Sequence, residues 1–140
     1  MTAPEGAVRI PPHCDETLGL ECLDKSVPGT TVWRMTADER FANPIGVVQG
    51  GFLAAMADSA MGAATIGQAR AGGRRVRSSS IEMKISFLAP APTGAELRCT
   101  ARVVRGGRRV VFAEAEIVDG RGVGVARASS SYLLTELTDR

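Results

Sequence analysis

Residues 49–66 have the sequence QGGFLAAMADSAMGAATI, a run of small and apolar residues with a single charge at Asp58. Ala and Met favour helix, and the run is too long for one β-strand. A helix that is apolar on every side either spans a membrane or lies buried inside a fold. The acidic residue near its middle and the lack of long aliphatic side chains argue against a membrane span. The stretch therefore predicts a long helix over about 52–66, closely covered by the rest of the chain.

Downstream of this stretch, apolar and polar residues alternate with a period of two, which is typical of half-buried β-strands. The alternation runs through four segments: 81–87, 97–103, 111–117 and 123–134. Gly106-Gly107 and Asp119-Gly120 are hairpin signals between the later segments. Four strands in series predict an antiparallel meander with one apolar face. The simplest packing is an α+β fold in which a curved antiparallel sheet wraps around the long helix.

The region before the helix is less regular. The prolines at 4, 11 and 12 predict an N-terminal arm over 1–17, followed by a single domain over 18–140, which suits a chain of 140 residues. Two short strands are expected between 18 and 35, separated by the turn-rich segment 25–29. A short helical turn is expected within 37–43.

Composition limits the functions open to the chain. The net charge of +2 is too balanced for a protein that coats nucleic acid, and aromatic residues, at 4%, are too few for base-stacking platforms. The only histidine, His13, excludes most zinc sites and weakens any histidine-based triad. Three cysteines without a Cys-x-x-Cys pair predict reduced thiols and a cytoplasmic location, with no signal peptide. We therefore expect no metal, no nucleic-acid partner and no membrane association.

Asp58 is the residue whose position most needs an explanation. A carboxylate within a buried apolar helix is costly unless it is paired or used. One interpretation is a group satisfied by hydrogen bonds at a polar interface, and the other is a catalytic base or nucleophile. Burial alone does not separate the two. Gly50 marks the helix start, where glycine is often only a cap, but where free amides and the helix dipole also suit a developing oxyanion.

The spacing of these two residues carries a further prediction. Gly50 and Asp58 lie about 12 Å apart along one helix axis, so one chain cannot bring both to a single reacting carbonyl. If both are catalytic, the helix start of one chain must meet Asp58 of another. This predicts a two-fold homodimer with two equivalent sites.

Several features follow one another along the chain: Asn43, Gln49-Gly50-Gly51, Asp58 on an Ala-rich helix, Ser80, and a strand that ends in Ala89-Pro90-Ala91. In this order they resemble hotdog-fold acyl-CoA thioesterases, over about 18–134. The chain is similar to the phenylacetate-degradation type and to 4-hydroxybenzoyl-CoA thioesterases. The resemblance implies a hotdog fold, a curved antiparallel sheet around one central helix. It also implies homodimers and often homotetramers, with active sites at the dimer interface.

The resemblance also implies roles for individual residues. Gly50 gives its backbone N–H to the thioester oxygen, and Asp58 of the partner chain acts as general base on water or as nucleophile through an anhydride. Ser80 helps to hold the attacking water, and Asn43 helps to orient the thioester. The serine is chosen among residues 78–80 by counting back from Pro90, and a polar strand entry is the alternative interpretation of this run.

Gln49 is a departure from the family pattern, because many relatives carry His there. Gln still donates a hydrogen bond but cannot shuttle a proton. Gly51 and Arg108 are further substrate-binding candidates, the latter for a CoA phosphate, although exposed solubilising charge is the commoner role of such an arginine.

The predicted function is hydrolysis of a medium-chain or aromatic acyl-CoA to free acid and CoA, with no cofactor beyond the CoA of the substrate. The alternative is a non-catalytic hotdog protein that binds acyl-CoA or acyl-carrier protein, which Gln49 keeps open. A hydratase or dehydratase is disfavoured, because such enzymes pair an acid with a histidine and His13 is poorly placed in the sequence.

Overall fold

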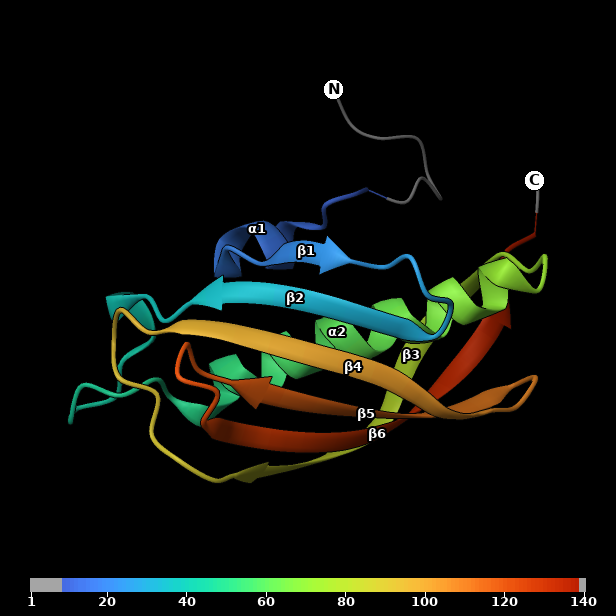
Figure 1. Cartoon of the computed structure of the whole chain (residues 1–140). Helices are drawn as coiled ribbons and strands as arrows, with labels where there is room; N and C mark the ends of the chain where they lie inside the picture. Colours follow the sequence, from blue (N-terminus) through green and yellow to red (C-terminus); the bar gives the residue numbers. More distant parts are fainter. Residues whose placement is uncertain (1–8, 139–140) are drawn as a thin grey trace.

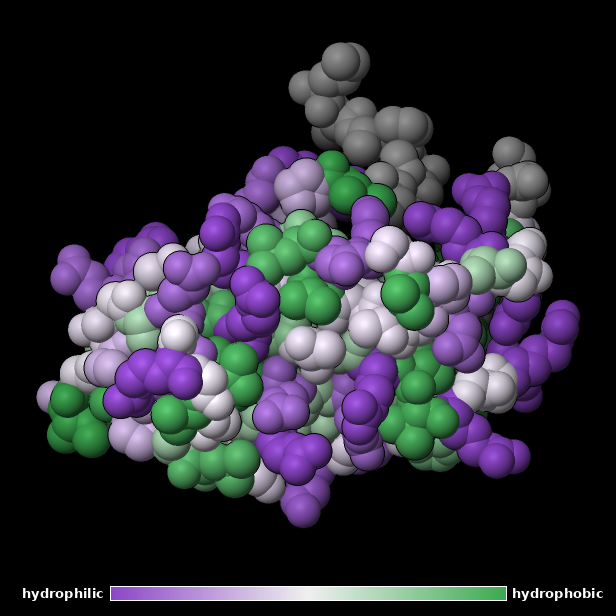
Figure 2. Space-filling view, viewed as in Figure 1, coloured by the Kyte–Doolittle hydropathy of each residue, from purple (hydrophilic) through white to green (hydrophobic). Residues whose placement is uncertain are grey.

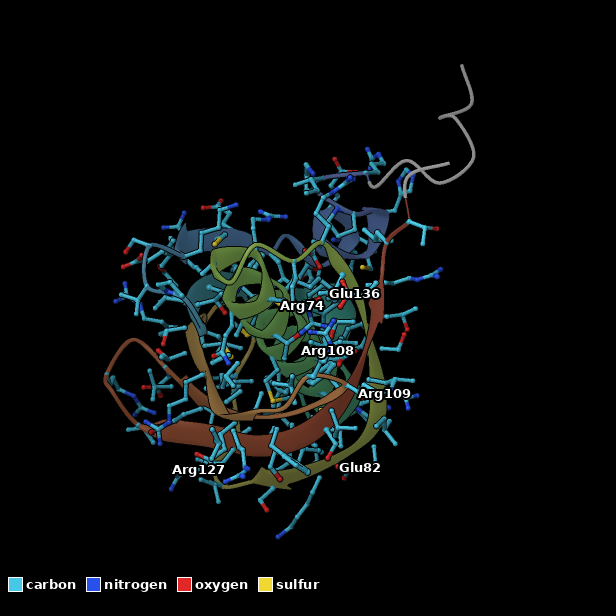
Figure 3. All side chains as sticks on the ribbon, turned by 90° about the vertical axis from the view of Figure 1, so that its right-hand side faces the viewer. Arg74, Glu82, Arg108, Arg109, Arg127 and Glu136 are labelled. Atoms are coloured by element: carbon cyan, nitrogen blue, oxygen red, sulfur yellow. The ribbon has the colours of Figure 1, made fainter. Side chains whose placement is uncertain are left out.

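Helix α2 (Gly50–Ala71) runs through the centre of the molecule in the computed structural model, which describes residues 9–138. It confirms the predicted helix and extends beyond 52–66 at both ends. Its buried side chains are almost all small or flexible: Leu53, Met56, Ala57, Ala60, Met61, Ala64, Thr65 and Ala69. Because alanine adds little bulk, strands approach the helix closely from several directions. Figure 3, which looks along α2, shows the sheet curled around it.

One antiparallel sheet supplies the cover. Its strands are β1 (Glu21–Asp24), β2 (Thr30–Thr36), β3 (Val76–Phe87), β4 (Glu96–Gly106), β5 (Val110–Val118) and β6 (Gly124–Glu136). Their spatial order is β1-β2-β4-β5-β6-β3. In Figure 1, β2 and β4 pass in front of α2, so the outer face of this part of the sheet faces the viewer. The α+β architecture predicted from the alternation is confirmed.

The predicted meander of four strands in series is wrong for its first strand. Strands β4, β5 and β6 follow one another, but β3 pairs with β6 and forms one edge of the sheet. The connection over 88–95 carries two prolines and joins strands that do not pair with each other, whereas the β4–β5 and β5–β6 connections are hairpins. The period of two assigns each residue to a face, but it contains no information on which strand lies beside which.

The N-terminal region is more ordered than predicted. Helix α1 (His13–Leu18) lies partly within the predicted arm and packs on α2, where the Oγ of Ser59 donates a hydrogen bond of 2.8 Å to the buried Asp15. Residues 1–8 of the arm lie outside the described residues. The short helical turn expected in 37–43 is confirmed as η1 (Glu39–Phe41).

The free edge of β3 combines length with exposed apolar groups. The strand spans twelve residues and pairs on one side only, and Ile81 and Phe87 are each more than half exposed. An edge strand of this length is a template for pairing with another chain. Over the outer face of the sheet, by contrast, Figure 2 shows separate hydrophobic groups between hydrophilic side chains. No helix among residues 9–138 is long and apolar enough to cross a membrane.

Candidate active site

A cavity of about 640 Å³ lies beside α2, bounded by residues of α1, β1, β2, β3 and β6. Much of its lining is apolar or small, including Val27, Trp33, Gly62, Ala63 and Ile66. The polar lining includes Asp58, Ser78, Ser80 and Tyr132. A cavity of this size, mostly apolar with a few convergent polar groups, has the character of a small-molecule site.

Asp58 reaches this cavity from the middle of α2. The carboxylate is half-buried, and its Oδ1 accepts a hydrogen bond of 2.7 Å from the hydroxyl of Tyr132 on β6. Burial, reinforced by the neighbouring carboxylate, raises the pKa of Tyr132, which is 2% exposed. The acid is therefore paired on one oxygen while it still faces a cavity, so it has features of both interpretations offered by the sequence.

Ser80 lines the same cavity from β3. Its Oγ lies 3.1 Å from the Oγ of Ser130 on β6, which in turn donates a hydrogen bond of 2.6 Å to the carbonyl of Glu82. Ser78 also lines the cavity and hydrogen-bonds to Thr65, whereas Ser79 is not part of the lining. Two of the three adjacent serines thus line the cavity, and Ser80 is linked to β6, the strand whose Tyr132 bonds to Asp58.

The start of α2 lies outside this cavity. Gln49 is the N-cap residue but its side chain makes no capping hydrogen bond, and the backbone N–H groups of Gly50 and Gly51 find no acceptor among the described residues. The ring of Phe87 lies against Gly50, where a Cβ would be 2.5 Å from the ring edge. Asn43 accepts hydrogen bonds from the N–H groups of residues 45 and 47 and so shapes the loop before the helix.

One chain therefore brings together Asp58 and Ser80 but not the predicted site residues at and before the start of α2. Gly50, Gly51, Gln49 and Asn43 are absent from the cavity lining. The predicted separation of Gly50 from Asp58 is consistent with their positions at the start and in the middle of α2.

Residues 45–126 match the Thioesterase superfamily, which is more than half of the chain. The chain belongs to the Thioesterase superfamily. It is a thioester hydrolase with the hotdog fold predicted from the sequence.

Similar proteins support the assignment. The human acyl-coenzyme A thioesterase 13 is 26% identical over 105 residues, which cover 75% of this chain and 72% of that protein. The structure of the Escherichia coli PaaI protein from the phenylacetic acid degradation operon has a TM-score of 0.79 at 26% identity, covering 89% of this chain and 84% of that one. The conserved protein PA5202 from Pseudomonas aeruginosa also has a TM-score of 0.79, at 29% identity, covering 89% and 94%.

Arg108 lies at the β4–β5 hairpin of the thioesterase, away from the cavity lining. Its backbone carbonyl accepts a hydrogen bond of 2.9 Å from Arg74, which also pairs with Glu136. Figure 3 shows Arg74, Arg108 and Arg109 at the end of the molecule that faces the viewer. Arg108 is exposed, so this end offers positive charge to an anion.

The other nucleophile and ligand candidates of the thioesterase are poorly suited to chemistry. Burial raises the pKa of Cys99 to about 12, which keeps its thiol protonated and unreactive. His13 is exposed on α1. Within residues 9–138 no group of three His, Cys, Asp or Glu side chains could hold a metal ion.

Two residues that contact the candidate site, Tyr132 and Ser130, were not singled out from the sequence. Both lie on the inward face of β6, which is otherwise occupied by apolar residues such as Ala128 and Leu134. A polar side chain on the apolar face of an alternating strand was the available signal, because a buried polar group needs a partner.

Proposed function

We propose that this thioesterase hydrolyses medium-chain or aromatic acyl-CoA thioesters to the free acid and CoA. The observation that carries the proposal is the Asp58 carboxylate, held by Tyr132 and facing a largely apolar cavity of about 640 Å³. The apolar lining favours an uncharged acyl group. The human relative is itself called an acyl-coenzyme A thioesterase, which supports CoA as the thiol part of the substrate.

In the proposed reaction, Asp58 acts as general base. It takes a proton from water as the water oxygen attacks the thioester carbon, and Ser80 accepts a hydrogen bond from the remaining O–H. The carbonyl oxygen becomes an oxyanion, stabilised by the Gly50 N–H and the positive end of α2. Collapse of the tetrahedral intermediate breaks the C–S bond, and the proton held by the carboxylate passes to the departing thiolate.

The alternative route has Asp58 attack the thioester itself and form a mixed anhydride. A single turnover in H₂¹⁸O tests for the anhydride, because label found in the protein would require it. General-base catalysis places the label in the released acid. Attack of water on the carboxyl carbon of a mixed anhydride would leave the label in the protein.

We further propose that the active site forms between two copies of the chain. Gly50 and Asp58 are about 12 Å apart along α2, so the Gly50 N–H must come from the partner. The unpaired edge of β3, with Ile81 and Phe87 exposed, supports a two-fold contact. Light scattering measures the oligomeric state and distinguishes a homodimer from the homotetramer that the family resemblance implies.

Mixed dimers test the shared site directly. Asp58→Asn removes the base, and Gly50→Pro removes the N–H, while proline remains compatible with the first helical position. A dimer with one copy of each variant keeps one intact site if the site is shared, because the unaltered Gly50 meets the unaltered Asp58. Statistical mixing should then recover about one quarter of wild-type activity from two inactive parents. No recovery would place both residues of a site in the same chain.

A thioester panel tests the activity. CoA release is followed with a thiol reagent for acetyl, octanoyl, palmitoyl and phenylacetyl thioesters. We expect octanoyl-CoA and phenylacetyl-CoA to be the better substrates. A purified chain that binds these thioesters but releases no CoA would instead be a binding protein for acyl-CoA or acyl-carrier protein.

The proposed reaction requires no metal or other cofactor, because its proton transfers use protein side chains. Activity should therefore survive dialysis against EDTA, and restoration by a divalent cation after such treatment would contradict the proposal. The free cysteines Cys14, Cys22 and Cys99 support the cytoplasm as the site of the reaction.

A further inference from the structure

Tyr132 contacts the proposed base more closely than any other polar side chain among the described residues. Its Oη lies 2.7 Å from Oδ1 of Asp58 and 3.1 Å from the backbone carbonyl oxygen of the same residue. Both partners can only accept when the acid is ionised, so the hydroxyl is the donor. Among the described residues, Oδ2 has no hydrogen-bond partner. One carboxylate oxygen is therefore fixed while the other is left for a proton or a reacting atom.

The tyrosine is suited to remain a donor. Burial and the adjacent carboxylate raise the pKa of Tyr132, so its hydroxyl stays protonated throughout the neutral range. The ring is 2% exposed and packs against Gly62 on the next turn of α2, where a Cβ would lie 3.7 Å away. The hydroxyl position is thus set by packing. A fixed donor holds the Asp58 carboxylate in one orientation and leaves its second oxygen free.

The next inward residue of β6 orders the other polar group of the site. Ser130 has one hydroxyl proton and donates it to the carbonyl of Glu82 at 2.6 Å. In the contact of 3.1 Å with Ser80, Ser130 must then be the acceptor and Ser80 the donor. The lone pairs of the Ser80 oxygen remain available to accept a hydrogen bond from water. Strand β6 thus donates a hydrogen bond to Asp58 through Tyr132 and accepts one from Ser80 through Ser130.

We propose that Tyr132 is a positioning residue of the thioesterase, which fixes the orientation of the Asp58 carboxylate. The proposal rests on the proposed function, since it matters for catalysis only if Asp58 is the base or nucleophile. It adds Tyr132 on β6 to a candidate site whose residues predicted from the sequence all lie earlier in the chain.

Tyr132→Phe tests the proposal with the smallest possible change. The ring is retained, so the packing against α2 is retained. The lost bond to a charged group corresponds to roughly a tenfold fall in kcat/KM, with the loss mainly in kcat. The acid limb of the kcat/KM profile should move, because the hydroxyl bonds differently to the ionised and the protonated carboxyl group. A merely structural role would lower thermal stability and leave the acid limb in place.

Thr65→Val is the matched control. Thr65 is 1% exposed on α2, and its hydroxyl bonds to Ser78 and to the carbonyl of Gly62, not to Asp58. The variant removes a buried hydroxyl of the same region, so it should lose stability without a shift in the acid limb. Equal shifts in both variants would overturn the proposal.

The wild-type protein allows a second test that does not depend on a variant folding. Tyr132 is the only tyrosine in the chain, so [¹³Cζ]tyrosine gives one NMR resonance. We expect this resonance to titrate with the same midpoint as the acid limb and to stop titrating in Asp58→Asn. A resonance that does not move through the acid limb would overturn the proposal.

Other groups around the cavity need a control. The remaining charged or titratable side chains in its lining are Arg9, Cys14, Asp15, Cys22, Lys25 and Arg70. Among them Asp15 is the only carboxylate, and it is bonded to Ser59, the neighbour of Asp58 in the chain. In Asp15→Asn the tyrosine resonance should still titrate. A titration lost in this variant would assign the effect to Asp15 and overturn the proposal.

The outcomes separate the two proposals. A chain that releases no CoA from any thioester of the panel would refute the proposed function, whereas full activity in Asp58→Asn would refute the role of Asp58 and with it that of Tyr132. An inactive Asp58→Asn together with a wild-type acid limb in Tyr132→Phe would leave the proposed function standing and refute the role of Tyr132.

Discussion

The middle and the beginning of α2 differ in how their polar groups are satisfied. At Asp58, one carboxylate oxygen accepts a hydrogen bond from the hydroxyl of Tyr132 on β6. At the beginning, the Gln49 side chain provides no capping bond, and the N–H groups of Gly50 and Gly51 meet no acceptor among residues 9–138. The fold therefore completes the acid half of the proposed site internally. It leaves the anion-binding half open to a group from outside the chain.

Asp58→Asn should break the completed half and give the largest effect. Asparagine keeps the shape and can still accept the hydrogen bond of Tyr132, so thermal stability should change little. It cannot accept a proton, so kcat/KM should fall roughly 10³-fold, within the range of general acid–base catalysis. Steady-state assays of CoA release, with a melting curve for each protein, measure both quantities. Retained turnover would remove Asp58 from the mechanism.

The sequence was sufficient to find these two halves because each has a rare feature. A single charge in a long apolar run singled out Asp58, and consecutive glycines marked the helix start. The periods of helix and strand also gave the architecture, including the sheet around α2. These patterns are formed by residues that lie close together in the sequence, so a single sequence is enough to detect them.

The missed features are all non-local. The bond between Tyr132 and Asp58 joins residues 74 positions apart, and the pairing of β3 with β6 joins residues as distant as Val76 and Glu136. Alternation assigns a residue to the inner face of a strand but does not identify the group opposite it. Helix α1 was missed for a related reason, since its docking depends on the contact of Asp15 with Ser59 rather than on any clear period. Residue roles that depend on such contacts need the structure.

Gly50→Pro should break the open half with the next largest effect. The substitution deletes the N–H proposed to bind the oxyanion, and loss of one such donor costs roughly 10²-fold in kcat. Gln49, in an extended conformation, is compatible with a following proline. Gly50→Ala is the control, because it adds a similar Cβ beside Phe87 but keeps the N–H. Equal losses in both variants would assign the effect to crowding by Phe87.

Ser130→Ala should sharpen the description of the completed half. Without this hydroxyl, the carbonyl of Glu82 loses its donor and Ser80 loses the acceptor that sets its orientation. We expect a loss of about 1–2 kcal/mol in the free energy of unfolding and about a fivefold fall in kcat/KM. Urea unfolding and steady-state kinetics measure the two effects. Ser131→Ala is the control, since Ser131 bonds only to the exposed side chain of Glu82. A fall in kcat/KM of the same size in the control would show that the orientation of Ser80 has no special role.

Arg108→Ala should give the smallest effect and act at a distance from both halves. If Arg108 contacts a phosphate of CoA, its loss should raise KM for an acyl-CoA about threefold at low salt, the scale of an exposed ion pair. The same acyl group on N-acetylcysteamine carries no phosphate, so its KM should not change. Arg127 lies on the outer face of the sheet, well away from Arg108 in Figure 3, and Arg127→Ala is the matched control. A KM that rises equally for both thioesters, or equally in both variants, would show that Arg108 only contributes solubilising charge. A rise confined to acyl-CoA would place the nucleotide end of the substrate at the β4–β5 hairpin, beyond the C-terminal end of α2, while the reacting thioester lies between Asp58 and the partner's helix start.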